Sequence, residues 1–268
     1  VTLDNLRAFE AQALSNTVWA YATAKESHPL LFDKVAEAAI SKQNELTSQG
    51  IANSLWAFAA TGQTNKRLFE SFAPTVAALI GECDSQNLAN IAWAYAVANV
   101  AAPSLFNDEF ISACLENEKQ FTLEELSQLH QWNLWQEELQ SDIRLHQPLQ
   151  ERCRDAFISR VAEPSAFQDD VIRHLKSVGL QPEEEVLTKS DYRLDALVEV
   201  NGKKIAIEVD GPTHFLGREP TGSTILKHRQ VINLDEIPVL SVPYWEWEKP
   251  GKGSDKKQQY LRDLLGLS

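Results

Sequence analysis

The first half of the chain repeats one pattern of apolar and polar positions. Trp19, Trp56 and Trp93 stand 37 residues apart, and one Gln, one Asn and one Phe in each unit keep the same interval. Four classes of position in one register indicate a repeated structural unit. The matched positions are Gln12, Gln49 and Gln86; Asn16, Asn53 and Asn90; and Phe32, Phe69 and Phe106.

Each unit predicts a pair of helices. Residues 86–96 place Leu88, Ala92 and Trp93 at helical spacing, which predicts a buried first helix. A Gly or Pro then breaks the pattern, and a second helix is predicted to begin at the next Leu-Phe pair. Because such hairpins bury their faces only by stacking, residues 1–140 are predicted to form an α-solenoid whose last unit, residues 121–139, is a degraded cap.

Two roles are considered for the repeated side chains: packing in the core and binding of a ligand. Trp and Phe at helical spacing among alanines are interpreted as the core between units rather than as platforms for bases. The repeated Asn is expected to make a buried hydrogen bond to a neighbouring turn, because a side chain that reads bases should differ between units. If the array reads a strand, the variable positions Thr17, Ser54 and Ile91 are candidates.

The second half predicts a different class of fold. Residues 141–164 are polar and are predicted to form a helical linker before a domain at residues 165–268. Ser165, after Pro164, is predicted to cap an amphipathic helix that ends at Gly179. Strands at 191–200 and 203–210 follow, joined by Asn-Gly, a strong signal for a hairpin turn. A strand at 239–243 and a helix at 255–265 complete an α-β-β-β-α order, which is typical of the restriction-endonuclease-like fold.

The predicted hairpin brings acidic side chains together. Glu208 and Asp210 share one strand face by the two-residue period, and the turn places Asp195 near Glu208. Acids this close hold a metal, bind a polar loop or share a proton. In a nuclease of this fold, Asp195 and Glu208 would bind the Mg²⁺ or Mn²⁺ that activates water, with Asp210 and His214 as further catalytic candidates. Asp210 stands where such nucleases often carry Lys, so a purely scaffolding role for the acids stays open.

Two features of this half are candidates for contact with RNA. Residues 214–229 are interpreted as a loop rich in hydroxyl groups and cations, which would reach phosphates. Two tryptophans on one predicted strand face would stack a base. The alternatives are an ordinary solvated loop and packing of at least one tryptophan against the last helix. The candidate residues are Arg218, Lys227, His228, Arg229, Trp245 and Trp247.

Composition narrows the classes of function. The chain has 268 residues, 43% of them hydrophobic, which is enough for two modest cores. It has no apolar run of about 18 residues, so no membrane association is expected. Three cysteines without CxxC spacing argue against a disulfide framework and a zinc site of that kind. Because the chain begins at Val1 and has no Met, we expect that a targeting segment has been removed.

The net charge of −13 argues against a protein that coats nucleic acid, since phosphates are normally contacted by Lys and Arg. Local patches would have to make any contact with RNA. The charge also favours an alternative in which the acidic array binds a protein, such as a component of a ribosomal or RNA-processing complex.

The motifs resemble known families in both halves. The repeat resembles the 37-residue variant of the octotricopeptide family of organellar RNA-binding repeats. Residues 165–268 resemble the RAP domain, on the motifs Leu194-Asp195-Ala196, IEVDGPTHF at 207–215, TGST at 221–224, KHR at 227–229 and VPYWEW at 242–247. The resemblance implies a mitochondrial or chloroplast protein that binds single-stranded RNA and acts in RNA stability, processing or ribosomal RNA maturation. It supports a nuclease-like fold without establishing cleavage.

Three hypotheses follow from the sequence. The first is an organellar RNA-binding protein. The second is an endoribonuclease that uses the acidic cluster with Mg²⁺ or Mn²⁺. The third is a non-catalytic adaptor that binds a protein partner.

Overall fold

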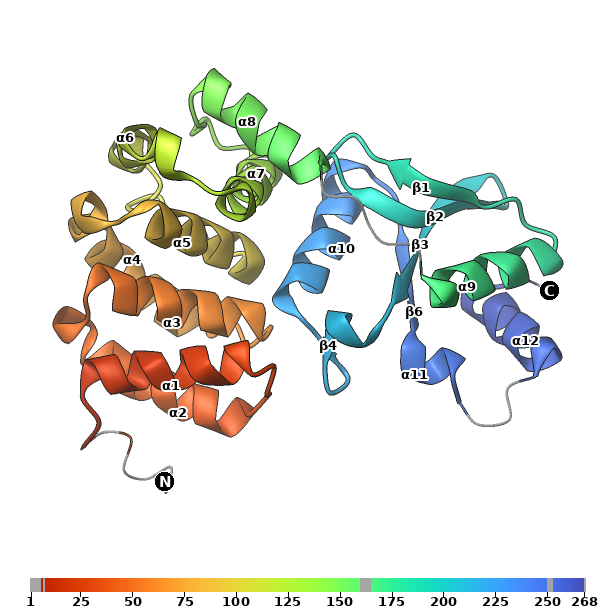
Figure 1. The fold of residues 1–268 in the computed structure, drawn as a ribbon, viewed down its shortest axis with the longest axis horizontal. Coiled ribbons are helices and arrows are strands. Elements are labelled where there is room, and N and C mark those ends of the chain that lie inside the picture. Colours follow the sequence, from red (N-terminus) through yellow and green to blue (C-terminus); the bar gives the residue numbers. More distant parts are fainter. Residues whose placement is uncertain (1–5, 7, 160–164, 250–252, 268) are drawn as a thin grey trace. The chain divides into compact units, whose positions relative to one another are not determined.

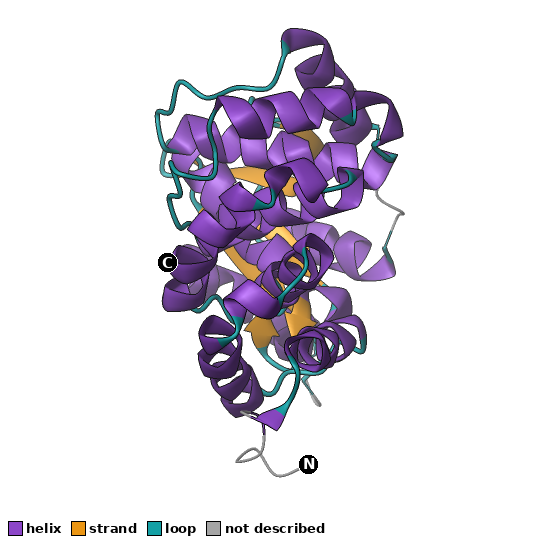
Figure 2. Cartoon of the chain, turned by 90° about the vertical axis from the view of Figure 1, so that its left-hand side faces the viewer, coloured by secondary structure: helices purple, strands orange, loops and turns teal. Residues whose placement is uncertain are grey.

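The computed structural model describes residue 6 and residues 8–159, 165–249 and 253–267 of the chain. It divides the chain into two compact units, each described on its own below. The helical unit comprises Val1–Ser159 and Leu216–Leu226, and the sheet unit comprises Arg160–Phe215 and Lys227–Ser268. Twelve α-helices lie within the described residues, and the strands all fall between residues 183 and 243 (Figures 1 and 2).

The helical unit consists of helix pairs that follow the repeat. The first helices of the pairs, α1, α3, α5 and α7, pack one against the next (Figure 1). The predicted two-helix unit is therefore confirmed, and residues 123–138 form the first helix of the fourth unit. The helices are α1 (Ala11–Thr23), α2 (Pro29–Ser41), α3 (Ser48–Ala60), α4 (Lys66–Ala78), α5 (Ser85–Ala98), α6 (Asp108–Glu116), α7 (Leu123–Glu138) and α8 (Gln147–Ile158).

The start of three of these helices is fixed by a capping side chain. Thr47, Asp84 and Thr122 each accept a hydrogen bond from a backbone N–H of the first turn of α3, α5 and α7. A cap of this type satisfies a donor that the helix itself leaves without a partner. A short 3-10 turn precedes each cap: Gln43–Glu45, Ile80–Glu82 and Glu118–Gln120. The cap is therefore common to the second, third and fourth units, although its residue type varies, and Glu10 at the start of α1 makes no such bond.

The repeated phenylalanines form the core between the pairs, as predicted. Phe32, Phe69 and Phe106 are 1%, 0% and 5% exposed. The ring of Phe69 meets Tyr95 edge-on at 5.1 Å between centroids, and the Tyr95 hydroxyl donates to the Phe69 carbonyl at 2.7 Å. Edge-to-face aromatic pairs of this kind add to the free energy gained by burial.

Helix α8 belongs to this unit. It packs on α7, and its residues Leu149, Cys153 and Ala156 lie in the same hydrophobic core as the repeats. Residues 147–158 of the segment predicted as a linker are thus part of the packed array. Residues 160–164, which include Pro164, lie outside the described part of the chain.

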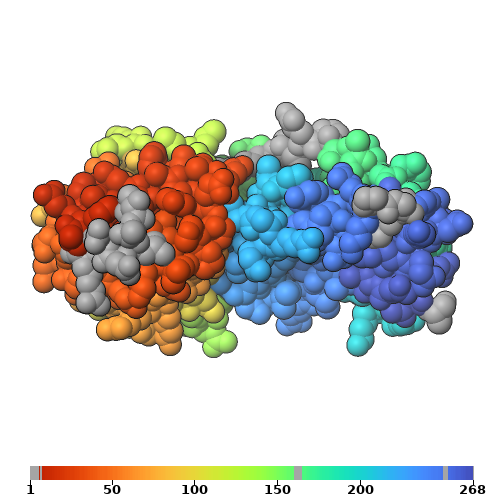
Figure 3. Space-filling view, turned by 90° about the horizontal axis from the view of Figure 1, so that it is seen from below, coloured from red at the N-terminus to blue at the C-terminus, as the bar shows by residue number. Residues whose placement is uncertain are grey.

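Figure 3 shows the surface of the chain, with α1 and α2 in red and orange and α12 in dark blue.

A segment from the second half completes the core of the helical unit. Leu226 is fully buried in it, and Gly222 lies so close to α3 that a Cβ there would stand 2.0 Å from the Ala59 carbonyl oxygen. No real side chain is compatible with that separation. The Thr221-Gly222-Ser223-Thr224 motif therefore contains a Gly because two backbones approach each other at this point.

Replacement of Gly222 with Ala is expected to lower the stability of the helical unit. The added methyl group would push this segment away from α3, at a cost of at least about 1 kcal/mol. Thermal unfolding should show a fall in Tm of about 2–4 °C per kcal/mol. The matched control is Gly81→Ala, since a Cβ at Gly81 meets nothing within 4 Å. Equal Tm values for the two variants would contradict the close approach.

The sheet unit is a four-stranded mixed sheet with helices beside it. The strands are β1 (Glu183–Leu187), β2 (Arg193–Val200), β3 (Lys203–Asp210) and β6 (Val239–Pro243), in the order β1-β2-β3-β6. β1, β2 and β3 pair antiparallel, and β3 and β6 pair parallel. Helices α9 (Ala166–Ser177) and α12 (Ser254–Leu265) pack together, and both contribute to the hydrophobic core of the unit.

The local predictions for this unit are largely confirmed. The Ser165 hydroxyl accepts from the Phe167 N–H at the start of α9, and Gly179 after its end has a φ of +94°. Asn201 and Gly202 have φ values of 53° and 76° and join β2 to β3. Two positive φ values are the signature of the hairpin turn that Asn-Gly predicts.

Two local predictions are wrong. Residues 222–234 form helix α10 (Gly222–Leu234) rather than part of a loop, preceded by the short strands β4 (Phe215–Leu216) and β5 (Glu219–Pro220). Trp245 and Trp247 lie in the short helix α11 (Tyr244–Trp247) rather than on a strand face. Strand β6 ends at Pro243, and the change to helical geometry there turns the two rings away from the predicted common face.

Asp170 joins three elements of the sheet unit. It accepts hydrogen bonds from the Trp247 indole at 2.8 Å and from the Lys257 ammonium at 2.5 Å. Burial by itself would raise the pKa of Asp170, but these donors outweigh it and lower that pKa below its ordinary value. A carboxylate with a lowered pKa stabilises the folded state above its ordinary pKa, and this stabilisation is lost as the pH falls through the folded-state value.

Replacement of Asp170 with Asn is therefore expected to destabilise the protein near neutral pH by about 1 kcal/mol, between the values for a surface ion pair and a buried charged hydrogen bond. The difference from wild type should shrink as the pH falls below the ordinary Asp pKa, because Asp170 is protonated first in the unfolded chain and, at lower pH, in the folded one. Urea unfolding at a series of pH values measures this. A difference that is independent of pH would show that the charge of Asp170 is not responsible.

Candidate functional site

A groove crosses the first helices of the helical unit. Its lining comes from α1, α3, α5 and the start of α7, and it encloses about 450 Å³. Half of the lining positions are the repeated Gln, Asn and Trp, which lie on one face of each helix because they are spaced by three or four residues. We call this the amide–tryptophan groove. It is lined by Trp19, Thr23, Asn53, Trp56, Gln86, Asn90, Thr122, Glu124, Glu125 and Gln128.

The repeated asparagines are not buried, which contradicts the expectation from the sequence. Asn16 is exposed, and Asn53 and Asn90 are half-buried. Two of them accept hydrogen bonds from other amides: Gln12 donates to Asn16 at 2.9 Å, and Gln128 donates to Asn90 at 3.2 Å. The asparagines therefore present amide groups along the groove instead of fixing a turn.

The repeated tryptophans differ in exposure from one unit to the next. Trp19 is 44% exposed, Trp56 is half-buried, and Trp93 is 7% exposed and donates its indole N–H to Gln131 at 2.9 Å. The predicted packing role thus holds for Trp93. For Trp19 and Trp56 the packing role alone is wrong, because both side chains also expose aromatic surface to the groove.

The variable positions considered as base readers point away from the groove. Ser54 is 2% exposed and Ile91 is 0% exposed. The hydroxyl groups of Thr17 and Ser54 donate to carbonyl oxygens of their own helices, at 2.7 and 2.8 Å. One residue beyond the Asn, an α-helix has turned by about 100°, which directs these side chains toward the neighbouring helices. Burial therefore excludes Ser54 and Ile91 as positions that read a strand, whereas Thr17 is half-buried.

The chemistry of the groove is aromatic and amide. Asn and Gln side chains offer both donors and acceptors, and the indoles offer flat apolar faces. The lining contains two acids and no Lys or Arg. One of these acids, Glu125, accepts from the Thr122 N–H at 2.9 Å in a capping box. The groove is suited to flat, hydrogen-bonding ligands rather than to phosphate groups.

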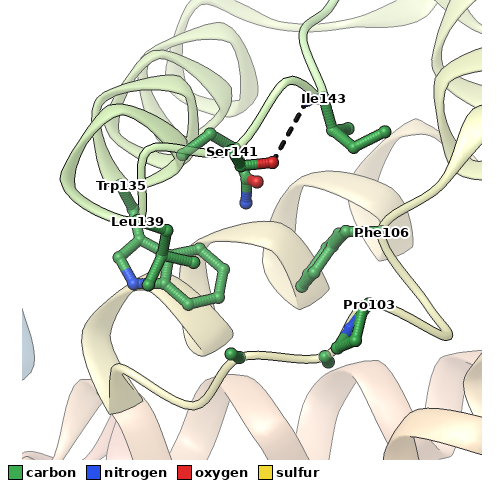
Figure 4. A pocket seen from close by; sticks show the side chains of 9 residues that line it. Pro103, Phe106, Trp135, Leu139, Ser141 and Ile143 are labelled. Atoms are coloured by element: carbon green, nitrogen blue, oxygen red, sulfur yellow. Dashed lines mark hydrogen bonds between the residues drawn. The ribbon is translucent and has the colours of Figure 1, made fainter.

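A second pocket in the helical unit is mainly apolar. It encloses about 200 Å³ between the segment after α5 and the end of α7, and Pro103, Phe106, Trp135 and Leu139 line it (Figure 4). Its lining has no charged group. This pocket lies away from the helix faces that carry the repeated Asn and Gln, so it is not part of the groove.

In the sheet unit, the end of β3 carries two buried acids. Glu208 and Asp210 are each 1% exposed and stand opposite Ser241 and Pro243 of β6. The Lys227 ammonium, from α10, pairs with Glu208 Oε2, and the Ser241 hydroxyl donates to Asp210 Oδ2. The predicted shared face of the two acids is confirmed.

Asp195 lies beside these acids. Ala196 pairs with Ile207 in the hairpin, which puts Asp195 level with Glu208. Its Oδ2 accepts from the backbone N–H of Val209 at 2.7 Å. Burial raises the pKa of Asp195, although Lys227 opposes that rise.

Two histidines also approach Asp210. His214 Nδ1 lies 3.2 Å from Asp210 Oδ1, and His228 Nε2, on α10, lies 3.8 Å from Asp210 Oδ2. Burial lowers the pKa of His228 and so favours a neutral imidazole, while Asp210 acts in the opposite direction. Burial also raises the pKa of Glu208 to about 8, despite the nearby Lys227.

The residues predicted to contact RNA lie in different environments in the structure. Arg218 is exposed and Arg229 half-buried, whereas Lys227 is paired with Glu208. Trp245 is half-buried and meets Phe215 edge-on at 4.3 Å. Trp247 is 2% exposed in the core, so the packing alternative accounts for it. His228 joins the acidic cluster, which its place in the sequence did not reveal.

Comparison with known proteins gives one family match, within the second half of the chain. Residues 207–264 match the family model for the RAP domain. This chain carries a RAP domain. The matched range includes Glu208, Asp210 and His228 but not Asp195. The resemblance stated from the motifs is confirmed for this range.

A relative with the same domain is the RAP domain-containing protein, chloroplastic, of Oryza sativa subsp. japonica. It is 36% identical over 106 residues, which cover 38% of this chain and 16% of the relative. The chain thus matches a small part of that protein's length. None of the described helices is both long and apolar enough to span a membrane.

Proposed function

We propose that the protein binds single-stranded RNA in an organelle, with the amide–tryptophan groove as the contact surface of the helical unit. The observation that carries this proposal is the repeated exposure of amide and indole groups along one groove. The RAP domain and its chloroplast relative support an organellar RNA-binding protein, and we place it in the chloroplast. Its role would be in RNA stability, processing or ribosomal RNA maturation, and its stacked pairs would serve as an octotricopeptide-like α-solenoid.

The recognition would rest on bases rather than on phosphates. Single-stranded RNA presents unstacked bases that can lie on aromatic side chains and hydrogen-bond through their edges. Trp19 and Trp56 supply the aromatic faces, and Asn53 and Asn90 supply donors and acceptors next to them. Because the same amide recurs in each unit, this contact would favour single strands without strong sequence selectivity.

The charge of the groove gives the test of this proposal. Binding that neutralises Z phosphates weakens with salt, with a slope of log K against log salt of about −0.7Z for single strands. Since the groove lining has no Lys or Arg, we expect a slope smaller in magnitude than about 2. Fluorescence anisotropy with a labelled single-stranded RNA at several salt concentrations measures it. A steep slope would place the RNA on cations outside the groove, and no binding at low salt would favour the protein-binding adaptor.

Cleavage of RNA by Asp195, Glu208, Asp210 and His214 with Mg²⁺ or Mn²⁺ stays a prediction. The two residues predicted to hold the metal each have a partner within the chain: Asp195 Oδ2 accepts from Val209, and Glu208 Oε2 pairs with Lys227. These contacts suit a folded scaffold as well as a metal site. We therefore derive no step of a hydrolytic reaction from this pair.

A further inference from the structure

Three side chains in the sheet unit converge on one point. Glu208 and Asp210 project from β3 and His228 from α10. Each offers one ligand atom, and these atoms all lie within 4.8 Å of one another. Two carboxylates and an imidazole at this separation combine two kinds of ligand group, rather than forming a simple cluster of acids.

These groups also lack the partners that buried polar atoms normally have. Among the described residues, Glu208 Oε1, Asp210 Oδ1 and His228 Nε2 are buried and have no hydrogen-bond partner. Most buried polar side-chain atoms in proteins are hydrogen-bonded, and each exception calls for an explanation. Three such atoms, one from each member of the cluster, indicate a ligand that binds all three together.

We propose that Glu208, Asp210 and His228 bind a divalent transition-metal ion such as Zn²⁺, Mn²⁺ or Co²⁺. Imidazole suits transition metals, whereas Mg²⁺ takes oxygen ligands and keeps several of its waters. The sequence predicted Asp195 and Glu208 as metal ligands, whereas the proposed set contains Glu208, Asp210 and His228. Asp195 is not a ligand in this set, because its Oδ2 accepts a hydrogen bond from the Val209 N–H.

Charge and access are consistent with a cation at this position. Lys227 neutralises one of the two acids through Glu208 Oε2 and leaves Oε1 available. The side chains of Lys227 and His228 are 21% and 24% exposed, so an ion can reach the cluster along α10. His214 Nδ1 lies 3.2 Å from Asp210 Oδ1 without forming a hydrogen bond to it. The site does not depend on RNA binding.

Titration of the chelator-treated full chain with Co²⁺ tests the proposal. We expect a saturable d–d absorption band in the visible range at one equivalent, which Zn²⁺ removes by competition and a large excess of Mg²⁺ does not. His228→Asn and Asp210→Asn should weaken Co²⁺ binding by more than about tenfold, since even residues that only orient ligands have effects of that size. Circular dichroism establishes that each variant is folded.

Two controls make the test specific. His146→Asn removes an exposed imidazole far along the chain and should leave Co²⁺ binding unchanged. Asp195→Asn should weaken Co²⁺ binding less than His228→Asn or Asp210→Asn does, because Asp195 lies outside the proposed ligand set. Binding that survives His228→Asn, or that is lost in Asp195→Asn instead, would overturn the proposed ligand set.

A second measurement needs no variant. A ligand that binds only the folded state raises its stability, so Zn²⁺ should increase the Tm of the wild-type chain and the same concentration of Mg²⁺ should not. Equal Tm values with Zn²⁺, with Mg²⁺ and with neither ion would overturn the proposal even if the variants failed to fold.

Discussion

Alanine at both Trp19 and Trp56 is expected to remove most of the affinity for single-stranded RNA. A base stacked on an aromatic side chain contributes about 1–3 kcal/mol, so each replacement should raise Kd by about 5- to 150-fold. Both indoles line the groove and one of them is 44% exposed, so their loss should change binding more than folding. Fluorescence anisotropy on the single and double variants measures the change in Kd.

The matched control is Leu30→Ala. Leu30 is a large apolar side chain, 55% exposed, at the start of α2 and outside the groove lining. This replacement should leave Kd unchanged while removing a similar exposed apolar surface. If the tryptophan variants bind RNA as tightly as Leu30→Ala does, RNA does not stack in the groove and the proposed contact surface is wrong.

Features of the fold that depend on local sequence could be predicted well. Asn201-Gly202 adopts the two positive φ values that its turn requires, and this turn fixes the register that sets Asp195 beside Glu208. The period of 37 residues likewise predicted the helix pairs, because each pair repeats the same local pattern. In both cases the signal and the structure that it specifies lie within a few residues of each other.

Features that depend on contacts distant in sequence could not be predicted as well. Thr221-Gly222-Ser223-Thr224 has the composition of a loop, yet it begins α10, in which Leu226 and Gln230, four residues apart, are both fully buried. The glycine reflects contact with Ala59, more than 160 residues earlier in the chain. Intrinsic propensity is overridden where tertiary packing provides the larger free energy.

In the candidate sites, too, local sequence predicted some features, while others depend on contacts that are distant in sequence. The hairpin indicated that Glu208 and Asp210 share a face, but only the helical course of residues 222–234 brings His228 to them. In the groove, the constancy of Asn16, Asn53 and Asn90 suggested a structural hydrogen bond, whereas the structure shows amides presented to a groove. Constancy between repeats identifies a shared position and does not by itself separate a buried role from an exposed one.

Replacement of Lys227 with Met is expected to have the largest effect on stability. Lys227 is the cation paired with Glu208, which is 1% exposed, so its loss would leave a buried carboxylate without its neutralising partner. Removal of one partner from a buried ion pair typically costs about 3–5 kcal/mol, and because the pKa of Glu208 is raised to about 8, this cost is expected above that pH, where Glu208 is ionised, and should be smaller at lower pH, where the carboxyl takes up a proton. Urea unfolding followed by circular dichroism should therefore show a much lower free energy of unfolding. In the control Lys66→Met, the lost partner is the surface residue Glu70, and the expected change is at most about 0.5 kcal/mol.

The double variant Lys227→Met with Glu208→Gln separates the charge from the packing. Because it removes both charges, it should recover most of the stability lost in Lys227→Met alone, since a neutral buried pair avoids the cost of an unpaired ion. The single variant should also bind Co²⁺ more tightly than wild type does, because the cation that opposes a second positive charge at Glu208 is gone, whereas the double variant lacks a proposed ligand and should bind it weakly. An equal loss of stability in the single and double variants would mean that Lys227 stabilises the sheet unit through the packing of its aliphatic stem. The charge of Lys227 would then not be needed to stabilise buried Glu208.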